Sequence, residues 1–248
     1  MTFKDHLSTQ SDIYAKYRPK YPPALFDYLA SITPDTQQAW DCASGSGQCA
    51  TGLRNSFVHV IATDGSESQV VHATHEKNIS YMVSVSEQIA IRSNTIDLVT
   101  VAQALHWFDF EKFYAEVNRV LRPGGLIATW CYTLCQISPQ IDQIIFELNY
   151  NTLGEYWSPE IYHVDGGYAT IPFPYKEEKT PEFKIQAQWD FLEFIGFLST
   201  WTAVKKFVQT HNRSPIAIFY KKLLHAWGDE ETTKEITWPI HMRVGRLK

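Results

Sequence analysis

Sulfur-containing residues are scarce in this chain of 248 residues, which holds four cysteines and three methionines. The cysteines show neither C-x-x-C spacing nor a neighbouring histidine cluster, which argues against a zinc site or a redox pair. We therefore expect reduced thiols that pack in the protein interior. The residues concerned are Cys42, Cys49, Cys131 and Cys135.

Long apolar runs are also missing. No segment approaches the ~20 consecutive apolar residues that a membrane-spanning helix needs. Residues 1–22 include Lys4, Asp5 and Asp12 and contain no apolar stretch of the signal-peptide kind. These absences predict a cytoplasmic protein with no membrane partner.

A large excess of charge of one sign is the third absence, because 27 acidic residues stand against 22 basic ones and the net charge is -5. Proteins that bind nucleic acids usually concentrate lysine and arginine in one domain, so we expect no nucleic-acid partner. The 44% of hydrophobic residues excludes a disordered chain, and the length fits a single α/β domain.

The first half of the chain alternates between compact apolar or β-branched runs and helical segments. This alternation predicts a parallel, doubly wound sheet. Ser66 fits the N-cap of the second of these helices. Strands are expected at residues 39–41, 58–63, 81–85, 96–102 and 126–132, and helices at residues 48–57, 67–76 and 110–121.

After residue 138 the rhythm changes, and residues 154–174 are rich in glycine, proline and aromatic side chains. We interpret this region as an insertion. Its aromatic residues suit a flat or apolar ligand beneath a cap, and core packing explains them equally well. A helix is expected at residues 141–153, a strand at 183–189, helices at 191–210 and 216–227, and a last strand at 236–247.

A glycine loop follows the first expected strand. Gly45 and Gly47 allow a tight turn and a close approach of a ligand to the backbone. Asp64 follows about 20 residues later, where a carboxylate can bind ribose hydroxyls. The spacing predicts a nucleoside ligand without saying which one.

Asp41, at the mouth of this loop, helps to decide which nucleoside ligand binds. A carboxylate there would repel a pyrophosphate, whereas it can attract the ammonium group of a methionine moiety. S-adenosylmethionine contains no phosphate, so the acidic residue favours it over a dinucleotide.

These residues support a resemblance to a known family. Asp41 with Gly45 and Gly47 is similar to the first motif of class I S-adenosylmethionine-dependent methyltransferases, and Asp64 is similar to the acidic end of their second strand. Leu-Arg-Pro-Gly-Gly at 121–125 looks like the turn before their fifth strand. The chain resembles the trans-aconitate methyltransferase-like branch over nearly its full length, on residues 14–22, 103–108, 238–239 and 243–246.

The resemblance implies one domain over residues 1–248. Its fold would be a Rossmann-like, doubly wound, seven-stranded and mostly parallel sheet with an antiparallel C-terminal strand and a helical, aromatic cap insertion. The protein would be a monomer or a homodimer acting on a small-molecule acceptor, and the resemblance suggests a carboxylate. The core would span about residues 35–135 and 180–248, the N-terminal lid about residues 1–30, and the cap about residues 138–180.

The resemblance also implies a site for S-adenosylmethionine. Tyr14, Arg18 and Tyr21 would belong to a lid over the cofactor, where Arg18 could hold a carboxylate; a solvated arginine and two packed tyrosines explain them equally well. No metal is expected, because no cluster of ligand-type residues accompanies the site. The implied cofactor-binding residues are Asp41, Ala43, Ser44, Gly45, Gly47, Asp64, Gly65, Ser66, Ser86, Glu87, Gln103, Ala104 and Trp107.

Two departures from the family pattern bear on cofactor affinity. Ala43 stands where the family usually has the first glycine of the loop, and its methyl group could crowd the cofactor. Ser86 and Glu87 stand where the family often has alanine and glutamate, or an acidic residue that meets the adenine ring. Both departures make weak cofactor binding conceivable.

His106 is the candidate general base, because it follows the fourth strand, at the edge where open α/β sheets bind their ligands. A carboxylate acceptor would need only a clamp, whereas a phenol, amine or carbon acceptor would need a base. His106 and Trp107 could instead line the cofactor pocket or pack on the next helix. Trp107 could also stack on a purine or shield the sulfonium.

Other functions remain open from the sequence. A nicotinamide-dependent oxidoreductase could use the same loop and Asp64, although Asp41 and the missing Tyr-x-x-x-Lys pair argue against it. A non-catalytic binding protein with this fold is a second alternative, suggested by Ala43. A methyltransferase acting on RNA or protein is disfavoured by the lack of a basic patch.

Overall fold

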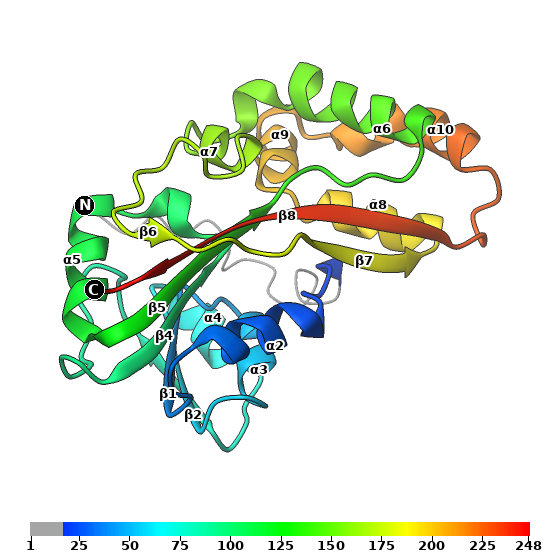
Figure 1. The fold of residues 1–248 in the computed structure, drawn as a ribbon. Helices are drawn as coiled ribbons and strands as arrows, with labels where there is room; N and C mark the ends of the chain where they lie inside the picture. The colour runs from blue at the N-terminus through cyan, green and yellow to red at the C-terminus, as the bar shows by residue number, and fades with distance from the viewer. Residues whose placement is uncertain (1–16) are drawn as a thin grey trace.

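A twisted mixed sheet organises the computed structural model, which describes residues 17–248 (Figure 1). Its strand order is β3-β2-β1-β4-β5-β8-β6, and β7 pairs with the other part of the long strand β8. The first five strands are parallel, whereas β8 runs antiparallel to β5, β6 and β7. The Rossmann-like sheet with an antiparallel C-terminal strand is thus confirmed; the two-residue β6 is an eighth strand that the sequence did not predict.

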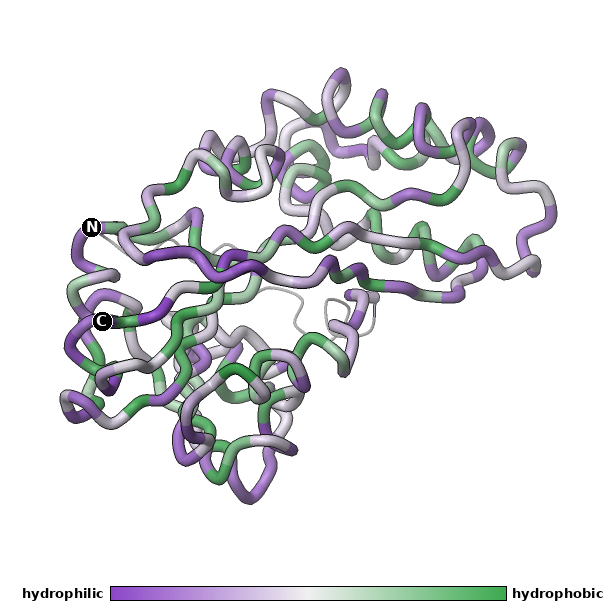
Figure 2. The backbone as a smooth tube through the Cα atoms, viewed as in Figure 1, coloured by the Kyte–Doolittle hydropathy of each residue, from purple (hydrophilic) through white to green (hydrophobic). Residues whose placement is uncertain are grey.

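The central strands are buried on both faces, as their apolar sequences require. Leu98 and Leu126 pack on one side of the sheet, while Val99 and Ile127 pack on the other. Figure 2 shows this hydrophobic centre in green. The strands are β1 (Gln38–Cys42), β2 (His59–Asp64), β3 (Ile79–Val83), β4 (Ile96–Ala102), β5 (Leu121–Tyr132), β6 (Lys176–Glu177), β7 (Phe183–Trp189) and β8 (Lys234–Arg246).

The helices of the first half pack on opposite faces of the sheet. α2 and α3 contribute Leu25 and Leu53 to the core on one face, and α5 contributes Phe113 and Val117 to the other. Ser66 caps α4 by accepting a hydrogen bond from the backbone N–H of Gln69, as predicted. The bounds are α2 (Pro23–Ile32), α3 (Gln48–Leu53), α4 (Glu67–Val71), the 3-10 turn η2 (Leu105–Trp107) and α5 (Phe110–Val120).

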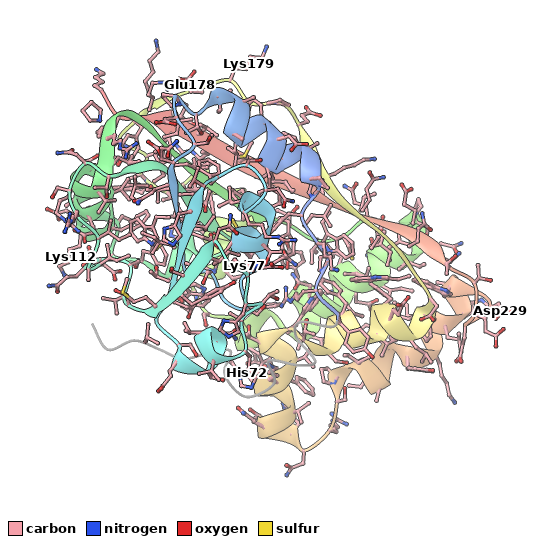
Figure 3. The ribbon with its side chains drawn as sticks, turned by 90° about the horizontal axis from the view of Figure 1, so that it is seen from below. His72, Lys77, Lys112, Glu178, Lys179 and Asp229 are labelled. Carbon is pink, nitrogen blue, oxygen red and sulfur yellow. The ribbon has the colours of Figure 1, made fainter. Side chains whose placement is uncertain are left out.

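In the view of Figure 1, α6, α7, α9 and α10 lie above the long β7–β8 pair, and α8 lies alongside it and contacts β7. α10 packs against both α6 and α8, so helices inside residues 180–248 pack together with those of the expected insertion at 138–180. Lys112 of α5 and Asp229 beyond α10 lie at opposite ends of the molecule (Figure 3). The elements are α6 (Pro139–Phe146), a π-helical turn η3 (Glu147–Thr152), the 3-10 turn η4 (Gly154–Tyr156), α7 (Ile161–Asp165), α8 (Phe191–Ser199), α9 (Thr202–His211) and α10 (Pro215–Trp227).

The single helix expected over residues 191–210 is wrong, because the chain breaks between α8 and α9. The hydroxyl of Thr200 donates to the carbonyl of Phe197, and Trp201 takes an extended backbone conformation. The break places the Trp201 indole against the rings of Trp157 and Phe197. Burial of this aromatic cluster therefore outweighs continuous helix formation.

The cysteines are free and buried, as expected: Cys42, Cys49, Cys131 and Cys135. Over residues 17–248, none of the helices combines the length and the apolar character needed to cross a bilayer.

Candidate active site

A cavity of about 1510 Å³ opens beyond the carboxyl ends of β1 and β4. The strand order reverses between these two strands, and open α/β sheets bind ligands at such a switch point. Tyr14 lies outside the described residues, and Gly47 does not line the cavity. The cavity is lined by the other predicted site residues: Arg18, Tyr21, Asp41, Ala43, Ser44, Gly45, Asp64, Gly65, Ser66, Ser86, Glu87, Gln103, Ala104, His106 and Trp107.

The glycine loop connects β1 to α3 through left-handed backbone conformations. Gly47 has a φ of 87°, and a Cβ atom there would come within 2.0 Å of the Tyr81 hydroxyl. Gly45 has a φ of 55°, and its N–H donates to Asp64 Oδ2 at 2.8 Å. Glycine at 47 is therefore explained by the close approach of β3, whereas Gly45 places its backbone at the cavity.

Ala43 also takes the left-handed conformation, with a φ of 55°. This backbone region suits glycine and crowds the Cβ atom of any other residue. The departure from the family pattern thus strains the loop itself, in addition to placing a methyl group at the cavity wall.

We expect Ala43→Gly to raise the free energy of unfolding by about 1 kcal/mol, because glycine carries no Cβ penalty here but has a more flexible unfolded state. The melting temperature should then rise by roughly 2–4 °C. Ala104→Gly is the matched control, because Ala104 also lines the cavity but has an ordinary φ of -132°. The explanation fails if Ala43→Gly melts at or below the wild-type temperature.

Asp41 is fully buried beneath the loop. Its Oδ1 accepts a hydrogen bond from the Thr100 hydroxyl at 2.9 Å, which in turn accepts one from the Cys49 thiol. Among the described residues, Asp41 Oδ2 has no hydrogen-bond partner. Burial raises the pKa of Asp41 to about 6, although these neighbouring donors partly oppose the shift. The carboxyl group is thus short of a positive or donating partner.

Asp64 ends β2 and holds two backbone amides of the surrounding loops. Its Oδ2 accepts from the N–H of Gly45 and its Oδ1 from the N–H of Ser66, each at 2.8 Å. A carboxylate oxygen can accept more than one hydrogen bond, so Asp64 can order both loops and still bind a ligand hydroxyl. The sequence spacing alone did not reveal this structural role.

Gln69 of α4 is a cavity residue that sequence reasoning missed. Its side chain is 2% exposed, and its Nε2 makes no hydrogen bond with any described residue. Ser44 Oγ at the glycine loop is likewise buried without a partner within residues 17–248. No pattern signals Gln69, because it lies in a short helix that only the fold brings to Gly45.

Gln103 joins the exits of β4 and β5. Its Oε1 accepts from the N–H of Tyr132 at 2.8 Å, and its Nε2 donates to the Tyr132 carbonyl at 3.3 Å. The residue has a φ of 58°, a strained conformation that such a clamp can hold. The side-chain amide therefore positions Tyr132, and Gln103 also lines the cavity.

Tyr132 receives a hydrogen bond from Arg18 Nη1 at 2.6 Å. The Arg18 guanidinium also lies 5.7 Å from the ring centre of Phe197, which lines the cavity with Trp157 and Trp201. The pKa of Lys205, which does not line the cavity, is lowered by burial and by the charge of Arg18. The apolar sequence from Phe191 to Trp201 was compatible with either a buried helix or a pocket wall, and Phe197 and Trp201 are both buried and at the cavity.

His106 lies in η2 and is 5% exposed. Its Nδ1 lies 3.0 Å from the hydroxyl of Tyr168, and its ring packs on that of Trp107 with centroids 4.6 Å apart. Burial, together with His163, lowers the pKa of His106 to about 3, so the ring is neutral at physiological pH. Nearby, Glu87 Oε1 accepts from the N–H of Asp109.

The fold and the site define a class: a doubly wound α/β protein with a glycine loop, and with a carboxylate at the end of the second strand, at the switch point. A family profile described as a methyltransferase domain matches residues 40–129. A candidate methyltransferase of Dictyostelium discoideum is 30% identical over 97% of this chain and 94% of its own length.

One solved structure and one further sequence relative support the same family. A candidate type II methyltransferase from Anaeromyxobacter dehalogenans is 38% identical and superposes with a TM-score of 0.87, covering 93% of this chain and 98% of that chain. A Saccharomyces cerevisiae protein named as an S-adenosylmethionine-dependent methyltransferase is 28% identical over 50% of this chain and 45% of its own length. The chain belongs to the methyltransferase family, and it is an S-adenosylmethionine-dependent enzyme.

The cofactor is thus S-adenosylmethionine. The residues around the glycine loop suit this group, because Asp41 Oδ2, Ser44 Oγ and Gln69 Nε2 are buried polar atoms without partners in the described part of the chain. An ammonium group and hydroxyl groups would satisfy such atoms. The nicotinamide-dependent and non-catalytic alternatives are set aside by the family assignment.

Proposed function

We propose that this enzyme transfers the methyl group to a carboxylate oxygen of a small-molecule acceptor, as in the trans-aconitate methyltransferase-like branch. The observation that supports this acceptor class is Arg18, a cation that lines the cavity beside the aromatic wall. A half-buried cation favours an anionic ligand beside it. Acidic Glu160 and Asp165 also line the cavity, from α7 and the residue before it.

We also propose a role for each group of residues that lines the cavity. Asp41 binds the ammonium group of the methionine moiety, and Asp64 binds the ribose hydroxyls. Ser86 and Glu87 meet the adenine ring and its exocyclic amine, while Trp107 shields the sulfonium. Arg18 and Tyr21 belong to the lid.

The bound cofactor supplies an electrophilic methyl group, which leaves in an in-line displacement. The protein orients the acceptor and excludes water, and such orientation is worth up to ~7–11 kcal/mol in favourable cases. In this proposal, Arg18 holds one carboxylate oxygen and leaves the other free to attack. A carboxylate is ionised at neutral pH, so no side chain has to remove a proton.

The acceptor class is tested with methyl-labelled S-adenosylmethionine and a panel of acids that includes trans-aconitate and benzoate. Each acid is paired with its carboxamide as a control. We expect label in methyl esters of one or more acids and none in the carboxamides. Label transferred to amines or phenols but to no acid would refute the carboxylate proposal.

Asp41 should make cofactor binding depend on pH. A carboxyl group with a pKa of about 6 is mostly protonated below that pH, and only the ionised form attracts an ammonium group. The affinity for S-adenosylhomocysteine should therefore rise between about pH 5 and about pH 7, by at most about tenfold per pH unit, and then level off. Calorimetric titration across this range measures it.

The control is Asp41→Asn, which cannot ionise. This variant should bind S-adenosylhomocysteine weakly and with little change over the same pH range. A wild-type affinity that stays constant while the protein remains folded would contradict the assigned role of Asp41.

A further inference from the structure

His106 and Tyr168 form a buried pair at the wall of the cavity. The two side chains are 5% and 0% exposed, and His106 Nδ1 lies 3.0 Å from Tyr168 Oη. A fully buried hydroxyl needs an acceptor for its proton. Within residues 17–248, Nδ1 of His106 is the one acceptor in contact with this phenol.

The charge state of both groups settles the direction of this hydrogen bond. Burial raises the pKa of Tyr168 well above its ordinary value, so the phenol keeps its proton, and the backbone amides of Leu105 and His106 lie against its oxygen. If Nδ1 carried a proton as well, the phenol proton would be buried without a partner, which is unfavourable. The phenol therefore donates, and Nδ1 accepts.

The surroundings keep the pair neutral. The other titratable groups that act on it are His163 of α7, Cys131 of β5 and Tyr114 of α5. Burial raises the pKa of the Cys131 thiol to about 12 and also raises the pKa of Tyr114, so both groups are uncharged at neutral pH.

Tyr168 is held in place against backbone strain. Its φ is 63°, which is unusual for a bulky residue. Arg243 Nη1 donates to its carbonyl oxygen at 3.0 Å, and its own N–H donates to the carbonyl of His163 at 2.8 Å. Strained residues of this kind persist where the surroundings fix them, and they concentrate at functional sites.

We infer that Tyr168 is a positioning residue that fixes His106 with its proton on Nε2, so that the imidazole offers the methyl acceptor a hydrogen-bond donor and not a base. His106 lines the cavity, and its Nε2 makes no hydrogen bond with a described residue. A carboxylate oxygen accepts such a bond and requires no base. The inference rests on the proposed function for the identity of the acceptor.

The test is nitrogen-15 NMR of the free protein labelled at its nine histidines, with His106→Gln used to identify the His106 signals. At about pH 7 we expect a neutral His106 ring protonated on Nε2. In Tyr168→Phe, which lacks the donor to Nδ1, we expect signals of both tautomers. A wild-type ring protonated on Nδ1, or a charged ring, would overturn the inference.

Tyr114→Phe is the matched control, because Tyr114 is a buried phenol of the same core that donates to the carbonyl of Pro172. Its His106 signals should match those of the wild type. Identical spectra for Tyr168→Phe and the wild type would also overturn the role of Tyr168. The NMR samples contain no methyl acceptor, so these spectra do not depend on which acceptor class the enzyme uses. If the proposed carboxylate acceptor is wrong, only the panel of acids reveals it.

Discussion

Asp64→Ala is expected to weaken the binding of S-adenosylhomocysteine by about 100-fold. Hydrogen bonds to a charged group are worth about 1.5–3 kcal/mol, and a tenfold change in affinity corresponds to about 1.4 kcal/mol. In the proposed site, loss of the ribose contacts would account for most of the effect. The rest comes from the loops, because Asp64 also holds the backbone amides of Gly45 and Ser66.

Calorimetric titration measures this affinity, and thermal unfolding checks that the variant is folded. Glu67→Ala is the matched control, since Glu67 is an exposed carboxylate in the first turn of α4 that does not line the cavity. It should bind like the wild type, and NADH should bind to neither protein. An Asp64→Ala variant that binds within about threefold of the wild type would remove Asp64 from the cofactor site.

His106→Leu is expected to lower kcat/KM for a carboxylic acid acceptor by about 10–100-fold, the value of one hydrogen bond to a charged group. His106→Gln should retain most of the activity. The glutamine amide reaches about as far as Nε2 and can donate a hydrogen bond, but it is not basic. Both variants should bind S-adenosylhomocysteine like the wild type.

The comparison between the two variants separates the possible roles of His106. If the His106→Gln variant is as inactive as the His106→Leu variant, the His106 ring acts as a base and the donor role is wrong. If both variants are fully active, His106 has no part in the reaction. The acid identified by the panel serves as the substrate, and steady-state rates provide the measurement.

The central sheet was predictable from local patterns. Residues 96–102 and 183–189 form β4 and β7 with the predicted bounds, because each is a short run between clear turn residues. Ser66 forms the predicted N-cap. Helix ends were less predictable: α3 stops at Leu53 rather than Phe57, where Asn78 Nδ2 binds the carbonyl groups of Arg54 and Phe57.

The residues of the candidate site also divide into those that the sequence predicted and those that it did not. Asp41, Gly45 and Asp64 lie within one β-α-β unit, from β1 through α3 to β2, so their spacing reports their geometry. Gln69 and Tyr168 have no such signal. Tyr168 reaches His106 across 62 residues of chain, and it does so only because the loop after α7 folds back against η2.

By itself, the sequence determined the alternation of strands and helices, the glycine loop and the acidic residues near the carboxyl ends of the first two strands. These features depend on neighbouring residues, whose backbone and burial preferences act over a few positions. The tertiary structure alone decided the strain at Ala43, the pKa values of Asp41 and His106, and the pairing of Tyr168 with His106. Each of these depends on burial and on partners from distant segments, because desolvation and hydrogen bonding act through space and not along the chain.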